Sequence, residues 1–181
     1  MKGNRMKRLM TISSKITTVT LMLSSLLFTQ LATADDEKLT VDIKRLTAES
    51  AIKVATAAML ECCKLGYQAT ATVVDKNGIV QAVIRDTLAP PISISVSKAK
   101  AFTSTNFSAD TSAMESRQSI NQNMGVGSFD GVLMSAGGVV INIGGTIYGA
   151  MGVSGAPSGK TDEDCAKAGI AAIAEDLEME G

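Results

Sequence analysis

The stretch ATATVVDKNGIVQAVIR, residues 69–85, decides the fold because it predicts two strands joined by a tight turn. β-branched residues fill both halves of the stretch, as is typical of strands. The pair Asn77-Gly78 between the halves is the strongest short-range indication of a two-residue hairpin turn. We therefore expect an antiparallel pair of strands, over residues 69–75 and 79–85.

The residues on either side of this hairpin predict helices. Apolar residues recur at three- and four-residue spacing over 41–65, which is the helical period. After the Pro90-Pro91 break, a second helix is expected over 93–107. A Ser and a Glu at capping-box spacing predict a short third helix over 112–119.

The last third of the chain has a different texture, since most of the 16 glycines lie at or after Gly125. Short β-branched runs alternate with glycine pairs, which predicts an antiparallel meander with strands over 132–135, 139–143 and 146–153. A final helix is expected over 161–177. The predicted fold class is α+β, with one five-stranded antiparallel sheet whose faces are covered by helices.

The N-terminus has the layout of a secretory signal peptide. Five Lys or Arg residues precede an uncharged apolar stretch, residues 16–31, which ends in Ala32-Thr33-Ala34. A stretch of that length is short of the roughly 20 residues that span a bilayer. We expect cleavage between Ala34 and Asp35, no membrane span after cleavage, and a periplasmic or secreted protein. Residues 1–34 are then the signal peptide, and 35–181 are a single domain.

Composition excludes several classes of function. The predicted mature part holds 12 Lys and Arg residues against 18 Asp and Glu, without a basic cluster, so no nucleic-acid partner is expected. The chain has no His, which excludes mechanisms that need imidazole, such as Ser-His-Asp and Cys-His catalysis. A zinc site is not expected either, because no two cysteines have metal-site spacing.

Three cysteines leave two alternatives open. In an oxidising compartment Cys62 or Cys63 bridges Cys165, and one thiol stays free or pairs between chains. Alternatively all three are small buried apolar residues. The second alternative is slightly favoured at this point.

Six separated segments resemble one family, the GlcG-like and HbpS-like haem-binding proteins, which include the C-terminal domain of PduO-type proteins. The resemblance covers about residues 39–175. Each segment alone is weak, but their order and spacing together are specific. The segments are TVVDKNG (72–78), RDTLAP (85–90), SKAKAFT (97–103), GGVV (137–140), GAMGVSGAPSG (149–159) and DEDCA (162–166).

The resemblance implies a profilin-like fold and assembly into homo-oligomers. Some members of the family bind haem, and exported members are linked to haem sensing, iron binding and protection from oxidative stress. Others occur beside genes of glycolate or diol metabolism. Because one fold serves several functions, the resemblance alone does not decide between them.

A haem iron would need an unusual ligand in this chain. Some relatives use His, whereas Met, Cys, Tyr, Lys or a hydroxyl oxygen would have to serve here. Met114 and Met124 are the candidates, because their segment is expected to be the least buried. HbpS-like proteins are thought to use a weak oxygen ligand at an exposed site, which implies loose haem binding.

A second set of candidates fits a haem propionate or another small anionic ligand. A guanidinium and an ammonium group at family motif positions suit a carboxylate, and glycine backbone can approach an anion closely. The alternatives are surface ion pairs and a turn that needs positive φ. The predicted ligand-binding residues are Arg85, Lys100, Thr103, Gly152 and Gly155.

Iron itself is a further candidate ligand, through the hard oxygen atoms of Asp86, Asp162 and Glu163. Such acids more often cap a helix or solvate its surface.

Three functions compete at this stage. The leading hypothesis is an exported protein that binds haem without turnover, in sensing, storage or protection from oxidative stress. The second is a peroxide-dependent haem-degrading enzyme, which is weakened by the lack of a dedicated general acid–base pair. The third is an accessory protein, linked to glycolate or diol metabolism, that contacts an exported sensor protein.

Overall fold

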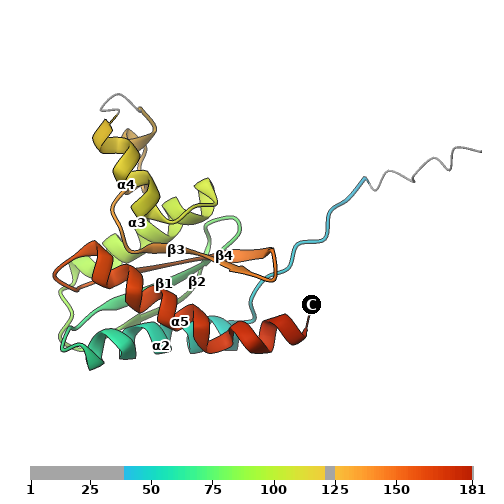
Figure 1. Ribbon diagram of the computed structural model, residues 1–181, viewed down its shortest axis with the longest axis horizontal. Helices are drawn as coiled ribbons and strands as arrows, with labels where there is room; N and C mark the ends of the chain where they lie inside the picture. The colour runs from blue at the N-terminus through green and yellow to red at the C-terminus, as the bar shows by residue number, and fades with distance from the viewer. Residues whose placement is uncertain (1–38, 121–124, 181) are drawn as a thin grey trace, which may run out of the picture. The chain divides into compact units, whose positions relative to one another are not determined.

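The computed structural model describes residues 39–120 and 125–180 (Figure 1). Residues 43–181 form one compact unit, and residues 1–42 belong to a separate one, of which 39–42 are described. The predicted signal peptide, the Ala34–Asp35 cleavage site and Met124 lie outside the described residues. Within the described ranges, no helix has the length and apolar character that crossing a membrane requires.

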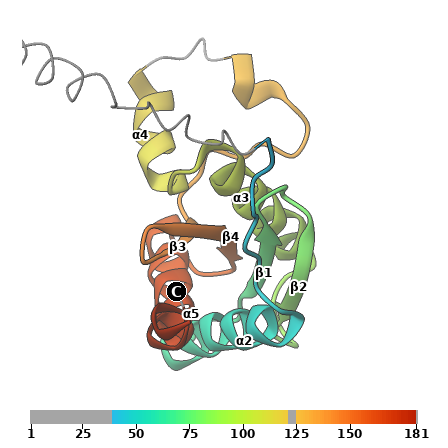
Figure 2. The ribbon, with the colours of Figure 1, turned by 90° about the vertical axis from the view of Figure 1, so that its right-hand side faces the viewer.

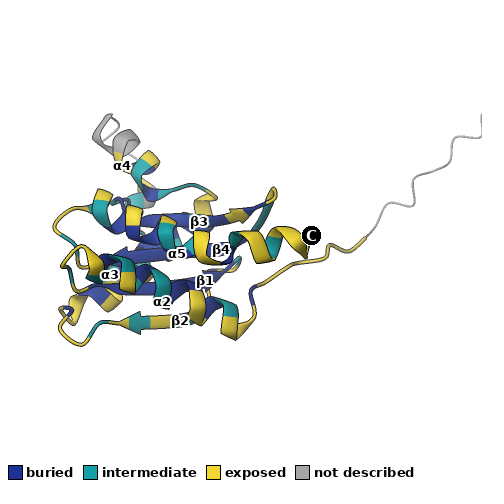
Figure 3. Ribbon diagram, turned by 60° about the horizontal axis from the view of Figure 1, so that its bottom comes forward, coloured by how far each residue is buried: buried dark blue, intermediate teal, exposed yellow. Residues whose placement is uncertain are grey.

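The predicted hairpin is confirmed and lies on one side of the sheet. Strand β1 (Thr70–Asp75) pairs antiparallel with β2 (Val80–Arg85) across the Asn77-Gly78 turn. Strands β3 (Gly138–Ile143) and β4 (Thr146–Ser154) form a second hairpin, and β4 pairs with β1. The strand order is β2-β1-β4-β3, so β1 and β4 are central, and every residue of β1 is buried (Figure 3).

The described residues contain four strands, because the expected strand over 132–135 is wrong. Backbone N–H groups of this stretch, and of Ala136 just after it, bond to atoms outside any strand, and the Val132 N–H donates to the Phe129 carbonyl at 3.1 Å. The Leu133 N–H donates to the Thr103 hydroxyl at 2.7 Å, and the Ala136 N–H donates to the Glu115 carboxylate at 3.2 Å. The sheet is therefore antiparallel as predicted, but one strand narrower in this part of the chain.

Two helices lie side by side on one face of the sheet, namely α2 (Ala48–Lys64) and α5 (Gly159–Met179) (Figure 2). Helix α2 begins later than its apolar period predicts, because the Thr47 hydroxyl accepts the Ser50 N–H and caps the helix there. Helix α5 begins earlier than predicted, because Ser158 caps it by accepting the Thr161 N–H.

The opposite face is covered by α3 (Ile92–Phe107), which packs on β1 and β4 (Figure 2). Helix α4 (Thr111–Ile120) follows, and a short 3-10 helix, η1 (Gly125–Ser128), precedes the chain's return to β3. Ser112 does not cap α4 as predicted, because the helix already begins at Thr111, and Glu115 accepts the Ala136 N–H. Instead the Thr111 hydroxyl accepts the Gly138 N–H at 2.8 Å, which fastens the start of α4 to β3.

The two sides of the sheet have different interiors. Beneath α2 and α5 the core is apolar and includes Val54, Val73 and Ile141. Beneath α3 it contains buried hydroxyl pairs, with Thr70 bonded to Ser93 at 2.6 Å and Thr72 to Ser97 at 2.8 Å. Buried hydroxyls are tolerated when they are hydrogen-bonded, as these are.

A disulfide bond joins Cys62 of α2 to Cys165 of α5, across 103 residues of sequence. The alternative of three buried thiols is therefore wrong, and the bridged alternative holds with Cys62 as the partner. Cys63, one residue further along α2, is a free, half-buried thiol.

Candidate functional site

A groove of about 570 Å³ lies along the side of α3 that faces away from the sheet. We call it the α3 groove. A volume in this range suits a small-molecule ligand. Its lining comprises Ile94, Ser95, Lys98, Ala99, Phe102, Asp130 and Gly131.

The helical period explains why these side chains share one side of α3. Positions 94, 98 and 102 are four residues apart and therefore lie above one another. The intervening positions Ser97 and Lys100 are buried towards the sheet. Since small hydroxyl residues occupy the inner side of α3, its larger apolar side chains are left for the groove.

Phe102 is held between two loops. A Cβ atom added at Gly78 would lie 2.7 Å from the Phe102 ring, and one added at Gly131 would lie 3.8 Å from it. Both glycines have positive φ, 77° and 86°, so the turns that bring the backbone close to the ring need glycine. The aromatic ring is thus fixed at the groove, where its exposed part is available to a flat ligand.

The chemistry of the α3 groove is mostly apolar, with one cation and one anion. Lys98 offers an exposed ammonium group, and Asp130 offers a carboxylate from the loop before β3. Among the described lining residues, the groups with a metal-binding oxygen or nitrogen atom in the side chain are the Ser95 hydroxyl, the Lys98 amine and the Asp130 carboxylate. The groove therefore suits a flat apolar molecule that carries a carboxylate.

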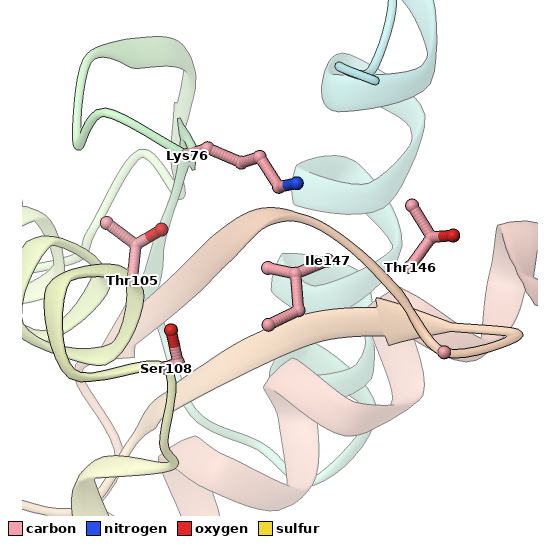
Figure 4. A pocket seen from close by; sticks show the side chains of 6 residues that line it. Lys76, Thr105, Ser108, Thr146 and Ile147 are labelled. Atoms are coloured by element: carbon pink, nitrogen blue, oxygen red, sulfur yellow. The ribbon is translucent and has the colours of Figure 1, made fainter. Parts of the chain in front are cut away.

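A second pocket, of about 470 Å³, is more polar (Figure 4). Lys76 reaches into it from the β1–β2 turn and Ile147 from β4, while Thr105 and Ser108 come from the end of α3. Its ammonium and hydroxyl groups suit a small polar or anionic solute better than an apolar ring system.

Lys100, a predicted anion ligand, is buried in the interior. Its ammonium lies 2.8 Å from the Asp162 carboxylate and 3.1 Å from the Val153 carbonyl, so it joins α3 to α5 and β4. Burial raises the pKa of the Asp162 carboxyl, although the bond to Lys100 opposes this shift. The Lys100 ammonium and the Asp162 carboxylate are therefore paired with each other in the interior.

The other predicted ligand-binding residues also have structural contacts. The Arg85 guanidinium donates to the Ala89 carbonyl, and the Thr103 hydroxyl donates to the Ala99 carbonyl while it accepts the Leu133 N–H.

The two predicted glycines are needed for close backbone packing. A Cβ atom at Gly152 would lie 2.0 Å from the Ser97 carbonyl oxygen, so glycine is required where α3 approaches β4. At Gly155, with φ of 142°, the corresponding distance to the Gln68 carbonyl is 2.3 Å. None of these residues lines the α3 groove.

Met114 was expected in an open segment, but only 5% of it is exposed, and it does not line the α3 groove.

The three predicted iron ligands each bond to a different partner. Asp86 accepts a hydrogen bond from the Cys63 thiol, Asp162 pairs with Lys100, and Glu163 pairs with Lys167 at 2.6 Å. Across residues 39–120 and 125–180, no three His, Cys, Asp or Glu side chains lie close enough to share a metal ion.

Sequence reasoning missed Lys98 and Phe102 as groove residues, although both lie in the segment SKAKAFT. The available signal was the recurrence of Ser93, Ser97 and Ser104 along α3. Small polar residues that repeat at helical spacing can mark the side that approaches a sheet closely. The larger side chains between them then face outwards.

Comparison with known proteins gives one family and several related structures. The family model described as "Haem degrading protein HbpS-like" matches residues 46–171. A crystal structure of a double mutant of Streptomyces reticuli HbpS is 36% identical, with a TM-score of 0.68, over 73% of this chain and 89% of that chain. No protein of curated function matches the chain significantly.

Two more distant structures share the fold. Klebsiella pneumoniae protein ORFY is 20% identical, with a TM-score of 0.69, over 74% of this chain and 94% of that chain. A PduOC–haem complex is 23% identical, with a TM-score of 0.65, over 71% of this chain and 95% of that chain.

Proposed function

Because the chain belongs to the HbpS-like family of haem-degrading proteins, we propose that it is a haem-binding protein whose ligand occupies the α3 groove. The observation that carries the proposal is the groove itself, which is apolar, contains an aromatic ring and has an ammonium group. Haem is a flat apolar ring system that bears carboxylates, so the groove complements it chemically. PduOC, which shares this fold, was crystallised with haem.

The residues of the groove fit the macrocycle better than they fit the iron. Phe102 and Ile94 offer apolar contact, and Lys98 is suited to a propionate. Iron would have the Ser95 hydroxyl, the Lys98 amine or the Asp130 carboxylate as ligand among the described lining residues, and His is absent from the whole chain. Haem, when bound, would supply redox-active iron, and the described lining residues Ser95, Lys98 and Asp130 would offer that iron oxygen or amine donors.

We propose binding without turnover as the first function. The ionisable side chains of the described groove lining are Lys98 and Asp130, and no hydrogen bond joins them as an acid–base pair. The second candidate is haem degradation, because the family description names it. Spectra of the haem complex, followed over time with peroxide, separate the two. If the protein degrades haem, the Soret band of the complex should bleach faster than that of free hemin under the same conditions.

Titration of the purified protein with hemin tests the proposal. We expect a saturable change of the Soret band, and a weaker response in an Ile94→Gln variant. Ile52→Gln is the matched control, because Ile52 is exposed to a similar extent, 49% against 41%, but lies on α2. A flat titration at micromolar protein, or equal losses in both variants, counts against haem binding in this groove.

Export to the periplasm or the medium is also proposed. It is supported by the signal-peptide layout of residues 1–34 and by the Cys62–Cys165 disulfide, since such bonds persist in oxidising compartments.

A homo-oligomer is proposed as well, supported by the exposed apolar side chains Leu88 and Ile92, which are 76% and 67% exposed. Light scattering of the protein as it leaves a size-exclusion column measures the subunit number.

A further inference from the structure

Two further donor atoms lie beside the Cys63 sulfur of α2, and none of the three residues concerned lines either pocket described above. The Cys63 sulfur lies 3.9 Å from the Met59 thioether sulfur and 2.9 Å from a carboxylate oxygen of Asp86. All three side chains are half-buried, so solvent reaches the cluster. From this geometry we propose that Met59, Cys63 and Asp86 form a binding site for a soft monovalent metal ion, Cu(I).

Local structure holds the three side chains together. Met59 and Cys63 are four residues apart on α2, a spacing that places their side chains next to each other. Asp86 follows β2 directly, and its backbone N–H is bonded to the Ala69 carbonyl at 3.0 Å. One oxygen of its carboxylate accepts the Leu88 N–H, which leaves the other oxygen for the thiol.

The distance between the two sulfur atoms suits a shared metal ion. Metal–sulfur bonds in proteins are about 2.3 Å long, as in zinc–thiolate sites. Two sulfur atoms 3.9 Å apart both lie at that distance from one ion when the angle at the metal is about 115°. That angle is close to trigonal, and the Asp86 carboxylate, which contacts the Cys63 sulfur at 2.9 Å, is the candidate for the third ligand.

The donor types decide which metal the site selects. Thiolate and thioether are soft ligands that favour Cu(I), whereas Mg²⁺ and Ca²⁺ prefer a full set of oxygen atoms. Zinc prefers four nitrogen or sulfur donors, and the chain has no His. Because the neighbouring Cys62 is held in the disulfide with Cys165, Cys63 supplies the thiolate alone. Binding replaces the thiol proton with the metal ion, and the proton leaves to solvent.

The test is an anaerobic titration of the full chain with Cu(I), maintained by ascorbate, in competition with a coloured Cu(I) chelator. We expect one Cu(I) per chain and an ultraviolet charge-transfer band from thiolate to copper. Cys63→Ser should abolish both signals, and Met59→Leu should weaken binding by roughly tenfold or more, as loss of a supporting ligand does. Met179→Leu is the matched control, because Met179 is 81% exposed near the C-terminus.

Two results overturn the proposal: a wild-type chain that takes no copper from the chelator, or a Cys63→Ser variant that retains it. Far-ultraviolet circular dichroism and intact mass verify that each variant is folded and that its disulfide is present. The copper site stands independently of haem. A hemin titration of Cys63→Ser and a copper titration of Ile94→Gln should therefore both match wild type.

Discussion

At the scale of single residues, Lys98 is the cation that the α3 groove offers to a carboxylate. We predict that Lys98→Ala weakens hemin binding about threefold, since an exposed ion pair contributes about 0.2–1 kcal/mol. The difference from wild type should shrink at high salt, which screens exposed charges. Lys76→Ala is the control, because it removes the same charge from the other pocket. Equal losses in the two variants would indicate an effect of net charge alone.

Cys63 should react more slowly than an ordinary thiol in the metal-free protein. The hydrogen bond to Asp86 raises the pKa of the Cys63 thiol above that of an ordinary cysteine, and burial adds to the shift. The same bond lowers the pKa of the Asp86 carboxyl. Since the thiolate is the nucleophile, Asp86→Ala should speed alkylation by iodoacetamide at pH 8 and move the midpoint of its pH profile downwards. An unchanged midpoint would mean that the carboxylate does not control this thiol.

The sequence identified the right segment of α3 but not its orientation. Lys98 and Lys100 are two positions apart, and at 3.6 residues per turn they point to roughly opposite sides of a helix. Which lysine faces solvent depends on the side of α3 that approaches Gly152 of β4, and that contact is long-range. Residue type alone therefore could not show that the Lys100 ammonium would be bonded to Asp162.

At the scale of elements, the Lys100–Asp162 pair connects α3 to α5 in the interior. We predict that Lys100→Met lowers the free energy of unfolding by about 3 kcal/mol at neutral pH, because it leaves a buried carboxylate without its cation. The double variant Lys100→Met, Asp162→Asn should recover part of the loss. A neutral amide can still accept the Ala156 N–H that Asp162 accepts at 2.9 Å.

The loss in Lys100→Met should depend on pH in a definite direction. Burial already raises the pKa of Asp162 above that of an ordinary aspartate, and removal of Lys100 raises it further. A carboxyl whose pKa is higher in the folded state favours folding most below its unfolded pKa, and this contribution is lost as pH rises through the folded pKa. Urea unfolding at several pH values should therefore show the smallest deficit near pH 4 and the largest at neutral pH.

Elements defined by local sequence were predicted well, and those defined by distant contacts were not. The β1–β2 hairpin follows from alternating β-branched residues and Asn77-Gly78, all within one stretch. Residues 132–135 have strand composition, yet Thr103 of α3 accepts the Leu133 N–H, and Glu115 of α4 accepts the N–H of Ala136 directly after the stretch. Helix α2 begins at its Thr47 cap because a single hydrogen bond there overrides a longer apolar period.

At the scale of the whole molecule, the sheet separates two layers with different chemistry. The α3 layer has buried hydroxyl pairs beside a small apolar cluster in its interior, and it carries the α3 groove on its outer side. The α2–α5 layer has an apolar interior, a disulfide between its helices and the copper site on α2. Since the two sites belong to opposite layers, variants at one should leave ligand binding at the other unchanged.

The stability of the whole domain should depend on whether the disulfide has formed, and therefore on the redox state of the compartment that holds the protein. Cys62 and Cys165 are 103 residues apart, and the loss of chain entropy in the unfolded state predicts that a bridge over a loop of that length stabilises the folded state by about 4.7 kcal/mol. Urea unfolding of a Cys62→Ala, Cys165→Ala double variant should show a loss of that size, whereas Cys63→Ala should show little.

The mass of the exported protein tests both the disulfide and the signal peptide. Exported protein should weigh two hydrogens less than its reduced form and begin at Asp35. Peptide mapping that finds Cys63 joined to Cys165 would contradict the pairing, and a protein that retains Met1 after export would contradict the cleaved signal.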